Sequence, residues 1–176
     1  MERVNQLHLY MGDGKGKTTA AMGLALRALG RGRRVLVAQF LKDGRSGELA
    51  ALRQLPGATV AAVEPIGKFV FRMTPEEKRA ARERQCAQAE ALTRLVEREA
   101  PDVIVLDELA LAMHMGMVTE EHGWALIEAG LRHGEVVTTG RSAPQSLIDR
   151  ADYVSEVVKL HHPYDKGLAA REGIEF

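Results

Sequence analysis

The sequence predicts one α/β domain over residues 1–176, in which helices cover both faces of a mostly parallel sheet. Two observations support this class. Short apolar runs of strand length alternate along the chain with longer segments of helical character, an order that is typical of a parallel sheet. The chain has the length of a single domain, and 45% of its residues are apolar, which is enough for one sizeable core.

The first half of the chain contains three predicted strands. Residues 4–11 alternate weakly and end at a glycine turn, which favours a strand, and the Ala-rich residues 17–29 favour a helix. Residues 33–41 form a continuous apolar run, as expected for a strand covered on both faces. A short helix is predicted over residues 46–56, where Pro56 ends it, and a strand over residues 58–64.

The longest predicted helix occupies residues 74–101. Thr74 can cap its first amides, Pro75 suits its first turn, and Glu76 and Glu77 suit the positive end of its dipole. Pro101 marks its end.

The second half continues the alternation. Residues 102–108 are a buried strand that ends in two acids, and residues 119–131 are a helix in which Gly123 is a weak point. Further elements are then predicted as a strand over 134–141, a short helix over 143–151 and a last strand over 152–160. The tail, residues 161–176, has no clear period.

Composition argues against several classes of function. Lys plus Arg equals Asp plus Glu, at 24 each, so bulk charge gives no case for nucleic-acid or membrane binding. Cys86 is the only cysteine, which excludes an internal disulfide and a thiolate metal cage. No apolar run approaches the ~18 residues of a membrane span, and the N-terminus lacks the features of a signal peptide. We therefore expect a cytoplasmic protein.

The segment GDGKGKTT has the character of a phosphate-binding loop that opens a helix. Its glycines let backbone amides point at phosphate oxygens, Lys17 can reach the outer phosphates, and the hydroxyl of Thr18 can bind a metal. Lys15 faces either phosphate or solvent. The loop is one residue shorter than the usual spacing, so either it is tighter or Met11 stands at the usual glycine position. The candidate nucleotide-binding residues are Gly12, Asp13, Gly14, Lys15, Gly16, Lys17, Thr18, Thr19 and Arg141.

The segment VIVLDE resembles the acidic strand that accompanies such loops, so the fold is predicted to be a P-loop sheet of the RecA-like type. Asp107 and Glu108 would bind Mg²⁺ or Mn²⁺ together with Thr18. Glu108 could instead act as a base toward water, or the acids could simply cap the next helix. Arg141, after VVTTG, is placed either to reach a phosphate or to lie on the surface. The loop and acids alone also fit an NTPase, a small-molecule kinase or a nucleotide-binding regulator.

Several segments, in order along nearly the whole chain, resemble the CobA-type ATP:corrinoid adenosyltransferases. These segments are GDGKGKTTAAMGLALRALGRGRRVLVAQFLK, VIVLDEL, TTGR, ADYVSEV and HHPYDKGLAAREGIEF. The short loop is part of that family's pattern. The resemblance implies that Co(I) of a reduced corrinoid attacks C5′ of ATP and releases inorganic triphosphate, in adenosylcobalamin biosynthesis or salvage. It also implies Mg²⁺, a cobalamin or cobyrinic-acid-type corrinoid, a reductant protein such as a flavodoxin, and a homodimer.

The resemblance gives a role to two aromatic residues in GKFVF. In the family, a Phe and a Trp separated by one residue close the lower axial face of the corrinoid; here Phe69 and Phe71 stand at the corresponding place. Together with Lys17, they are the candidate catalytic residues. Phe71 departs from the Trp of the best-known members, which changes the bulk of the wall. The alternative, from the residues alone, is that both rings belong to the hydrophobic core.

Overall fold

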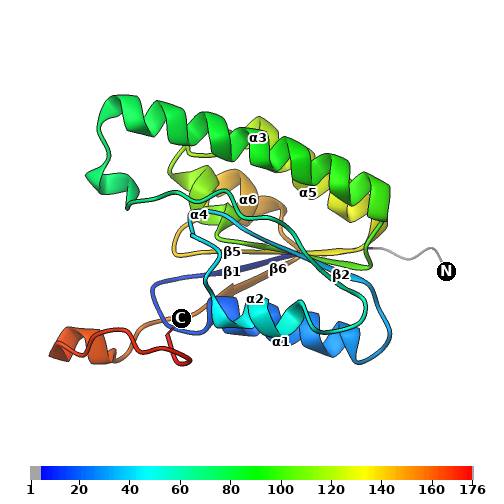
Figure 1. The fold of residues 1–176 in the computed structure, drawn as a ribbon, viewed down its shortest axis with the longest axis horizontal. Helices are drawn as coiled ribbons and strands as arrows, with labels where there is room; N and C mark the ends of the chain where they lie inside the picture. Colours follow the sequence, from blue (N-terminus) through cyan, green and yellow to red (C-terminus); the bar gives the residue numbers. More distant parts are fainter. Residues whose placement is uncertain (1–4, 176) are drawn as a thin grey trace.

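A computed structural model describes residues 5–175 and shows a six-stranded sheet in which all strand pairs are parallel (Figure 1). The strand order is β3-β2-β4-β5-β1-β6. The strands are β1 (Leu7–Met11), β2 (Val35–Gln39), β3 (Ala58–Val60), β4 (Val103–Asp107), β5 (Glu135–Gly140) and β6 (Tyr153–Glu156). The predicted start of the first strand at residue 4 lies outside the described residues.

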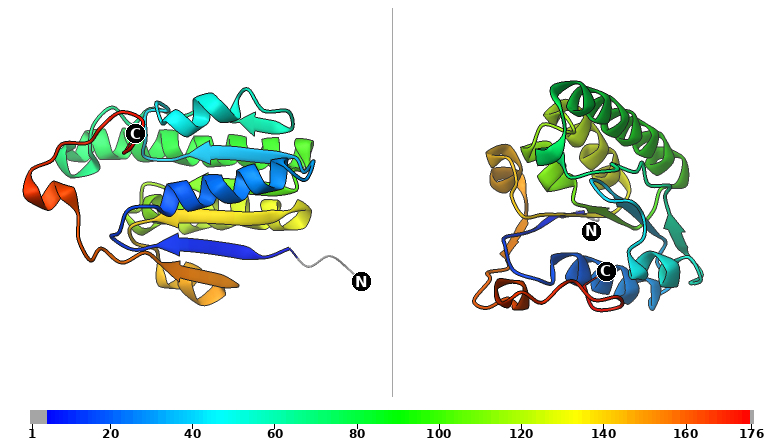
Figure 2. Two further views of the ribbon diagram at one scale, coloured as in Figure 1. Left: turned by 90° about the horizontal axis from the view of Figure 1, so that it is seen from below. Right: turned by 60° about the vertical axis from the view of Figure 1, so that its left-hand side comes forward.

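Helices cover both faces of this sheet (Figures 1 and 2). One face carries α1 (Lys17–Leu29) and α2 (Gly47–Leu52). The other carries α3 (Pro75–Glu99), α4 (Leu109–His114), α5 (Glu120–His133) and α6 (Gln145–Arg150). The expected α/β class, a P-loop sheet of the RecA-like type with helices on both faces, is confirmed. The structure also contains two short 3₁₀ helices, η1 (Val70–Arg72) and η2 (Pro163–Lys166). Between residues 5 and 175, no helix is long and apolar enough to cross a membrane.

The central strand β4 shows why its sequence is continuously apolar. Val103 and Val105 pack toward α1, in one buried cluster, whereas Ile104 and Leu106 pack toward α3, α4 and α5, in a second cluster. Successive side chains of a strand point to opposite faces. A strand buried on both faces therefore needs apolar residues along its length, which Val103 to Leu106 provide before the strand ends at the acid Asp107.

The ends of α3 are built as predicted. The amide of Glu77 donates to Thr74 Oγ1 at 3.3 Å, and the amide of Thr74 donates to Glu77 Oε2 at 2.7 Å. This reciprocal pair satisfies two amides that the helix itself leaves without partners. At the other end Ala100 adopts a left-handed conformation (φ 45°) just before Pro101, and the helix stops.

Several elements differ from the sequence-based expectation, among them β2, which covers 35–39 rather than 33–41, and α2, which covers 47–52 rather than 46–56. The third strand is shorter than predicted, 58–60 rather than 58–64, and the last covers 153–156 rather than 152–160. Both are edge strands, so each has one neighbour to hold it. Helix α4 was not predicted, because it has six residues of which four are buried, and such a short apolar segment has no visible period.

Gly123, expected to weaken its helix, lies inside α5 and has a packing role. A Cβ atom at this position would lie 2.4 Å from the sulfur of Met113 on α4. The absence of a side chain lets α4 lie against α5.

The two-sided burial of β4 predicts where the sheet is most sensitive. Replacing Ile104, which is fully buried, by Ala should lower the free energy of unfolding by about 2–5 kcal/mol, because it removes core contacts and leaves a cavity. Urea denaturation measures this loss. Leu26→Ala on α1, where the side chain is 56% exposed, is the control and should change stability by about 0.5 kcal/mol or less. Equal losses in the two variants would contradict this description of the core.

Candidate functional site

The predicted functional segments meet at the carboxyl edge of the sheet. The loop after β1, the acids after β4, the turn after β5 and the tail after β6 all lie on the side toward which the strand arrows point in Figure 2. In open parallel sheets this edge is where ligands bind. The topology therefore gathers into one place residues that are more than a hundred positions apart in the sequence.

The glycines of the loop are required by a close backbone crossing. Gly12 and Gly16 have positive φ angles of 110° and 120°. The amide of Gly14 donates to the carbonyl of Val157 at 2.7 Å, and a Cβ atom at Gly12 or Gly14 would lie 2.5 or 2.7 Å from that oxygen. The amide of Gly12 donates to the carbonyl of Arg141 at 3.2 Å. Protein carbonyls thus hold these two amides, and the segments just after β5 and β6 fix the shape of the short loop.

Lys17 begins α1 and folds back over the loop. Its Nζ donates to the carbonyl of Gly14 at 2.7 Å. Burial lowers its pKa, while the charges of Glu108, Asp13 and Asp107 oppose that shift. The N-cap position before Lys17 is Gly16, so no side chain covers the first amides of the helix. A positive side chain and the positive end of a helix dipole therefore face the same space.

Asp107 is the most heavily bonded side chain of the site. It is fully buried, and its two oxygens accept hydrogen bonds from four other side chains. The donors are Thr18 Oγ1 (2.9 Å) and Thr139 Oγ1 (2.7 Å) to Oδ1, and Gln39 Nε2 (3.0 Å) and Lys42 Nζ (2.5 Å) to Oδ2. Through these hydrogen bonds the carboxylate links α1 to the neighbouring strands β2, β4 and β5.

Glu108 has the opposite surroundings. It adopts a left-handed conformation (φ 61°) at the N-cap of α4, where its side chain makes no capping hydrogen bond, so the prediction that the acids merely cap the next helix is wrong for this residue. Its Oε2 atom is buried without a hydrogen-bond partner among the described residues. Burial raises the pKa of Glu108, and Asp107 adds to the shift. A strained backbone and an unsatisfied carboxylate oxygen mark a site prepared for a ligand.

The donor set fits a hard divalent cation. The hydroxyl of Thr18 and the carboxylates of Asp107 and Glu108 supply oxygens, which Mg²⁺ and Mn²⁺ prefer. Of the two acids, Glu108 has the free oxygen. Among residues 5–175 no three His, Cys, Asp or Glu side chains converge as a complete metal cage. A cation here would therefore share its coordination with substrate phosphates and water, as Mg²⁺ commonly does.

One residue of the loop, Asp13, lies beside a small pocket of about 280 Å³. Asp13, Arg141 and the tail residues Tyr164 and Asp165 line it, together with Lys159 and His162. Arg141 is exposed, and its charge influences the pKa values of both Lys17 and Asp13, so it faces the loop rather than lying on a remote surface.

Lys15, within the loop, and Thr19, in the first turn of α1, are also exposed. The pKa of Glu175, in the tail, is lowered to about 2, chiefly by hydrogen bonds from Arg171, with a smaller contribution from the charge of Lys15. This contribution places the end of the tail near the loop as well.

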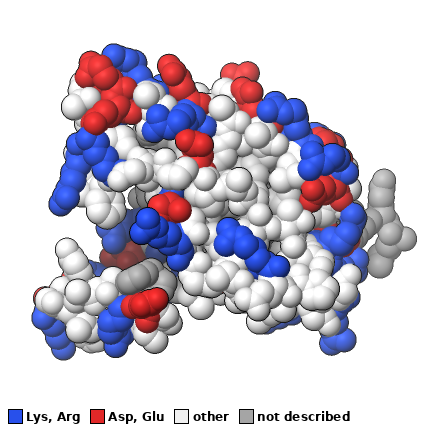
Figure 3. Space-filling view, in the orientation of Figure 1, with Lys and Arg blue, Asp and Glu red and all other residues white. Residues whose placement is uncertain are grey.

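Phe69 and Phe71 are not core residues, so that alternative is wrong. Their side chains are 67% and 73% exposed, with ring centroids 5.4 Å apart and an interplanar angle of 15°. The guanidinium of Arg72 lies 5.9 and 5.6 Å from the two ring centroids. Viewed as in Figure 1, the molecule is hollowed at the left, between the part that carries η1 and the part that carries η2 (Figure 3). Two large apolar rings that are exposed side by side favour a binding role over a structural one.

A buried chain of glutamines links the segment before Phe69 to the acidic site. Gln39, which bonds Asp107 through its side chain, accepts a hydrogen bond from Gln88 Nε2 at its carbonyl oxygen (2.9 Å). Gln88 Oε1 accepts from Gln85 Nε2 (3.3 Å), which also donates to the carbonyl of Glu64 (3.2 Å). These bonds fix α3 and the loop that precedes it against the carboxyl edge of the sheet.

Sequence reasoning missed Gln39 and Lys42 as individual residues. Gln39 was visible as a polar residue in an otherwise apolar strand, which is a signal for a buried hydrogen-bonding partner. Lys42 follows the same strand at its carboxyl end. Their contact with Asp107 depends on β2 lying beside β4, and the sequence does not reveal that order.

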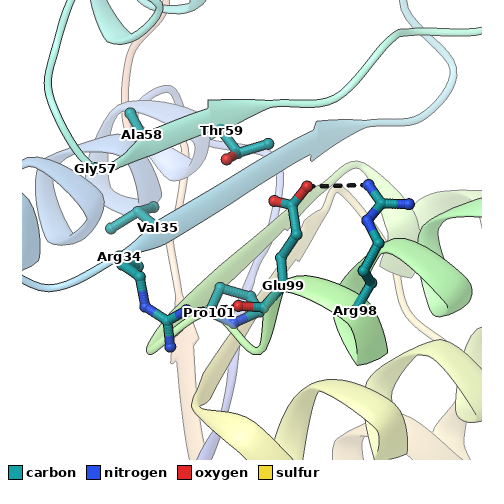
Figure 4. A pocket seen from close by; sticks show the side chains of 8 residues that line it. All are labelled: Arg34, Val35, Gly57, Ala58, Thr59, Arg98, Glu99 and Pro101. Carbon is teal, nitrogen blue, oxygen red and sulfur yellow. Dashed lines mark hydrogen bonds and ion pairs between the residues drawn. The ribbon is translucent and has the colours of Figure 1, made fainter.

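A larger pocket, of about 490 Å³, lies at the opposite edge of the sheet (Figure 4). Its lining includes Arg34, Ala58 and Pro101, near the starts of β2, β3 and β4. Arg34 donates to the carbonyls of Glu99 and Ala100 at 2.7 and 2.5 Å, so its charge serves the end of α3. None of the predicted site residues lies there, and the carboxyl edge remains the candidate site.

Fold and site together define a P-loop nucleotide-binding protein. The family described as ATP:corrinoid adenosyltransferase BtuR/CobO/CobP matches residues 3–176, and the chain belongs to this family of enzymes. It is 36% identical to a corrinoid adenosyltransferase of Pseudomonas aeruginosa, over 97% of this chain and 83% of that protein. It is 32% identical to corrinoid adenosyltransferase CobA of Salmonella typhimurium and 31% identical to a corrinoid adenosyltransferase of Escherichia coli, each over 96% of this chain and 84% of the relative.

The raised pKa of Glu108 makes a prediction about stability. Above its usual pKa of 4.5 the buried carboxylate is held with less solvation than in the unfolded chain, so the ionised side chain destabilises the fold. Glu108→Gln should therefore raise the melting temperature at pH 8 in EDTA, by roughly 2–4 °C if the gain is about 1 kcal/mol. The gain should shrink as the pH falls through the raised pKa toward 4.5, because the wild-type side chain then takes up a proton.

Calorimetry across pH 5–8 measures this difference. Glu83→Gln, on the exposed side of α3, is the matched control, because it makes the same chemical change at the surface. A lower melting temperature for Glu108→Gln than for wild type at pH 8 would contradict the assigned environment.

Proposed function

We propose that this chain transfers the 5′-deoxyadenosyl group of ATP to the cobalt of a reduced Co(I) corrinoid and releases inorganic triphosphate. An electron pair of Co(I) forms the cobalt–carbon bond at C5′. The C5′–O bond breaks, and its electron pair leaves with the triphosphate. The observation that supports this proposal best is the combination, on one edge of a member of this family, of a phosphate loop and two exposed phenylalanine rings.

The loop residues are suited to hold the departing triphosphate. Lys17, Arg141 and the first amides of α1 provide positive charge toward the place where negative charge gathers. Thr18, Asp107 and Glu108 would hold Mg²⁺ or Mn²⁺, which supplies Lewis-acid stabilisation of phosphate oxygens when bound. The corrinoid brings its own nucleophile, so the protein needs no general base, and its contribution is positioning and electrostatics.

Phe69 and Phe71 are suited to cover the lower face of a corrinoid. Their exposed faces offer apolar area that a flat macrocycle can bury, and phenyl rings carry no nitrogen or oxygen to bind cobalt. Removal of the lower axial ligand would leave a four-coordinate Co(II), which is easier to reduce. An external one-electron donor of the flavodoxin type, a homodimer, and a place in adenosylcobalamin biosynthesis or salvage all belong to this proposal.

Identification of the leaving group tests the proposal. The protein is supplied with chemically reduced cobalamin, ATP and Mg²⁺, and the products are separated. Intact triphosphate together with a light-sensitive adenosylated corrinoid is the expected result. ADP or orthophosphate without adenosylated corrinoid would instead identify a RecA-like NTPase or a kinase, and no turnover would point to a regulatory nucleotide-binding protein.

Lys17 is expected to stabilise the negative charge that develops on the leaving triphosphate. Lys17→Ala is expected to lower the turnover number by about 10²–10³, the usual loss when one preorganised electrostatic contact is removed. Initial rates with Co(I) corrinoid measure the loss. Lys78→Ala, an exposed lysine of α3, should leave the rate unchanged. A Lys17→Ala enzyme with normal turnover would show that the loop does not hold the triphosphate in the proposed way.

Phe71 should matter most for the reduction of cobalt. Phe71→Ala is expected to slow the reaction that starts from Co(II) and a reductant several-fold more than the reaction that starts from preformed Co(I), because the lower face would be open to a ligand. The two assays are run on the same preparation. Losses of equal size in both would assign Phe71 to corrinoid binding alone.

A further inference from the structure

Lys42 occupies a position that the proposed metal site also needs. Its Nζ lies 2.5 Å from Asp107 Oδ2 and 3.4 Å from Thr18 Oγ1. Both side chains belong to the donor set for Mg²⁺ described above. The ammonium group therefore already sits, as a cation, between two of the proposed metal ligands.

The electrostatics of Asp107 explain why a cation is needed there. Asp107 is fully buried, and an ionised carboxylate without a positive partner is costly to bury. The side chains of Thr18, Thr139 and Gln39 are neutral donors, and the ion pair with Lys42 supplies the compensating charge. The same pairing works against a metal ion, because an ammonium group and a divalent cation attracted to one carboxylate repel each other.

The local backbone allows Lys42 to leave. It lies between Leu41 and Gly44, which have positive φ angles of 54° and 75°, in a loop outside the sheet. The Lys42 side chain is 26% exposed, and a lysine stem has four rotatable carbons. Lys17 and Thr18 are adjacent at the start of α1, and Lys42 Nζ already lies 3.4 Å from Thr18 Oγ1. Phosphate oxygens bound beside Lys17 would therefore lie within the reach of a released Lys42.

We propose that Lys42 is an exchangeable counter-ion of the site, which neutralises Asp107 in the free protein and moves to the triphosphate when the nucleotide and its metal bind. This inference rests on the proposed function, because it assumes that a divalent cation and a triphosphate bind at this edge. It explains how one carboxylate can remain neutralised before and after substrate binding. It also makes nucleotide and metal binding mutually dependent, since the nucleotide offers Lys42 a new anionic partner.

Metal binding to the nucleotide-free protein tests the exchange. Mn²⁺ affinity is measured by the loss of the free-ion signal in electron paramagnetic resonance, for wild type and for Lys42→Met, which keeps the length of the side chain and removes its charge. Lys42→Met should bind Mn²⁺ about tenfold or more tightly than wild type, because the competing cation is gone. It should bind metal-free ATP, in EDTA, several-fold more weakly by calorimetry.

Arg45→Met is the matched control. Arg45 belongs to the same loop, and the substitution removes the same charge, but its side chain is 86% exposed and pairs with Asp43. It should leave Mn²⁺ affinity unchanged. If Arg45→Met tightens Mn²⁺ binding as much as Lys42→Met does, the effect is one of general charge and the proposal is wrong. The proposal is also wrong if Lys42→Met binds Mn²⁺ no better than wild type.

Lys42→Gln provides a second variant that keeps a hydrogen-bond donor for Asp107. If the uncharged variants fold only when Mn²⁺ is present, the metal has replaced the ammonium and the proposal is supported. If neither folds even with Mn²⁺, Lys42 is a permanent structural partner, and the exchange is excluded. If Lys42→Met binds Mn²⁺ more tightly but the wild-type protein transfers no adenosyl group, this inference stands and the proposed function is overturned. If the wild-type protein transfers the adenosyl group but Lys42→Met has unchanged Mn²⁺ affinity, the proposed function stands and this inference is overturned.

Discussion

One buried carboxylate dictates how the carboxyl edge of this sheet is assembled. Asp107 has no contact with solvent, so each of its oxygens must find donors within the protein. Those donors come from the first turn of α1, from the end of β5, and from the end of β2 and the loop that follows it. Because three separate segments must meet at this one group of β4, the phosphate loop has a fixed position relative to the central strands.

The two neighbouring acids, Asp107 and Glu108, differ in their hydrogen bonding as a result of this arrangement. Asp107 has its hydrogen-bonding capacity filled by protein groups, whereas Glu108 turns away through a left-handed backbone and keeps a buried oxygen without a partner. Adjacent residues of a strand point to opposite faces, and the change of backbone conformation at Glu108 departs from that alternation. In the free protein, one acid thus holds neighbouring segments together, and the other keeps an oxygen atom without a hydrogen-bond partner.

The sequence was sufficient for the fold class and for the place of the glycine-rich loop directly before its helix. The apolar run of β4 and the caps of α3 are local features, and they were predictable because burial and hydrogen bonding at those positions depend on neighbours in the chain. The position of Lys17 and Thr18 at the start of α1 was predictable because the glycine-rich loop is followed at once by an Ala-rich helix, and their role toward phosphate stays a prediction.

Contacts between distant strands were not predictable. Lys42 meets Asp107 only because β2 lies next to β4, and periodicity carries no information on strand order. The exposure of Phe69 and Phe71 was hidden for a different reason. Phenylalanine is usually buried, so composition favours the core. Only the structure shows that Phe69, just before the short helix η1, and Phe71, within it, are both exposed.

The position of β1 has a consequence for how the protein is made. This first strand lies between β5 and β6, and the amide of Gly14 is held by the carbonyl of Val157, which is 143 positions later in the chain. On the ribosome the N-terminal segment emerges early, but its neighbours β5 and β6 are synthesised after the other strands of the sheet. The loop after β1 can therefore take its final shape only once β5 and β6 have been made. A nascent chain that stalls before them would contain the loop sequence without the backbone that holds it in place.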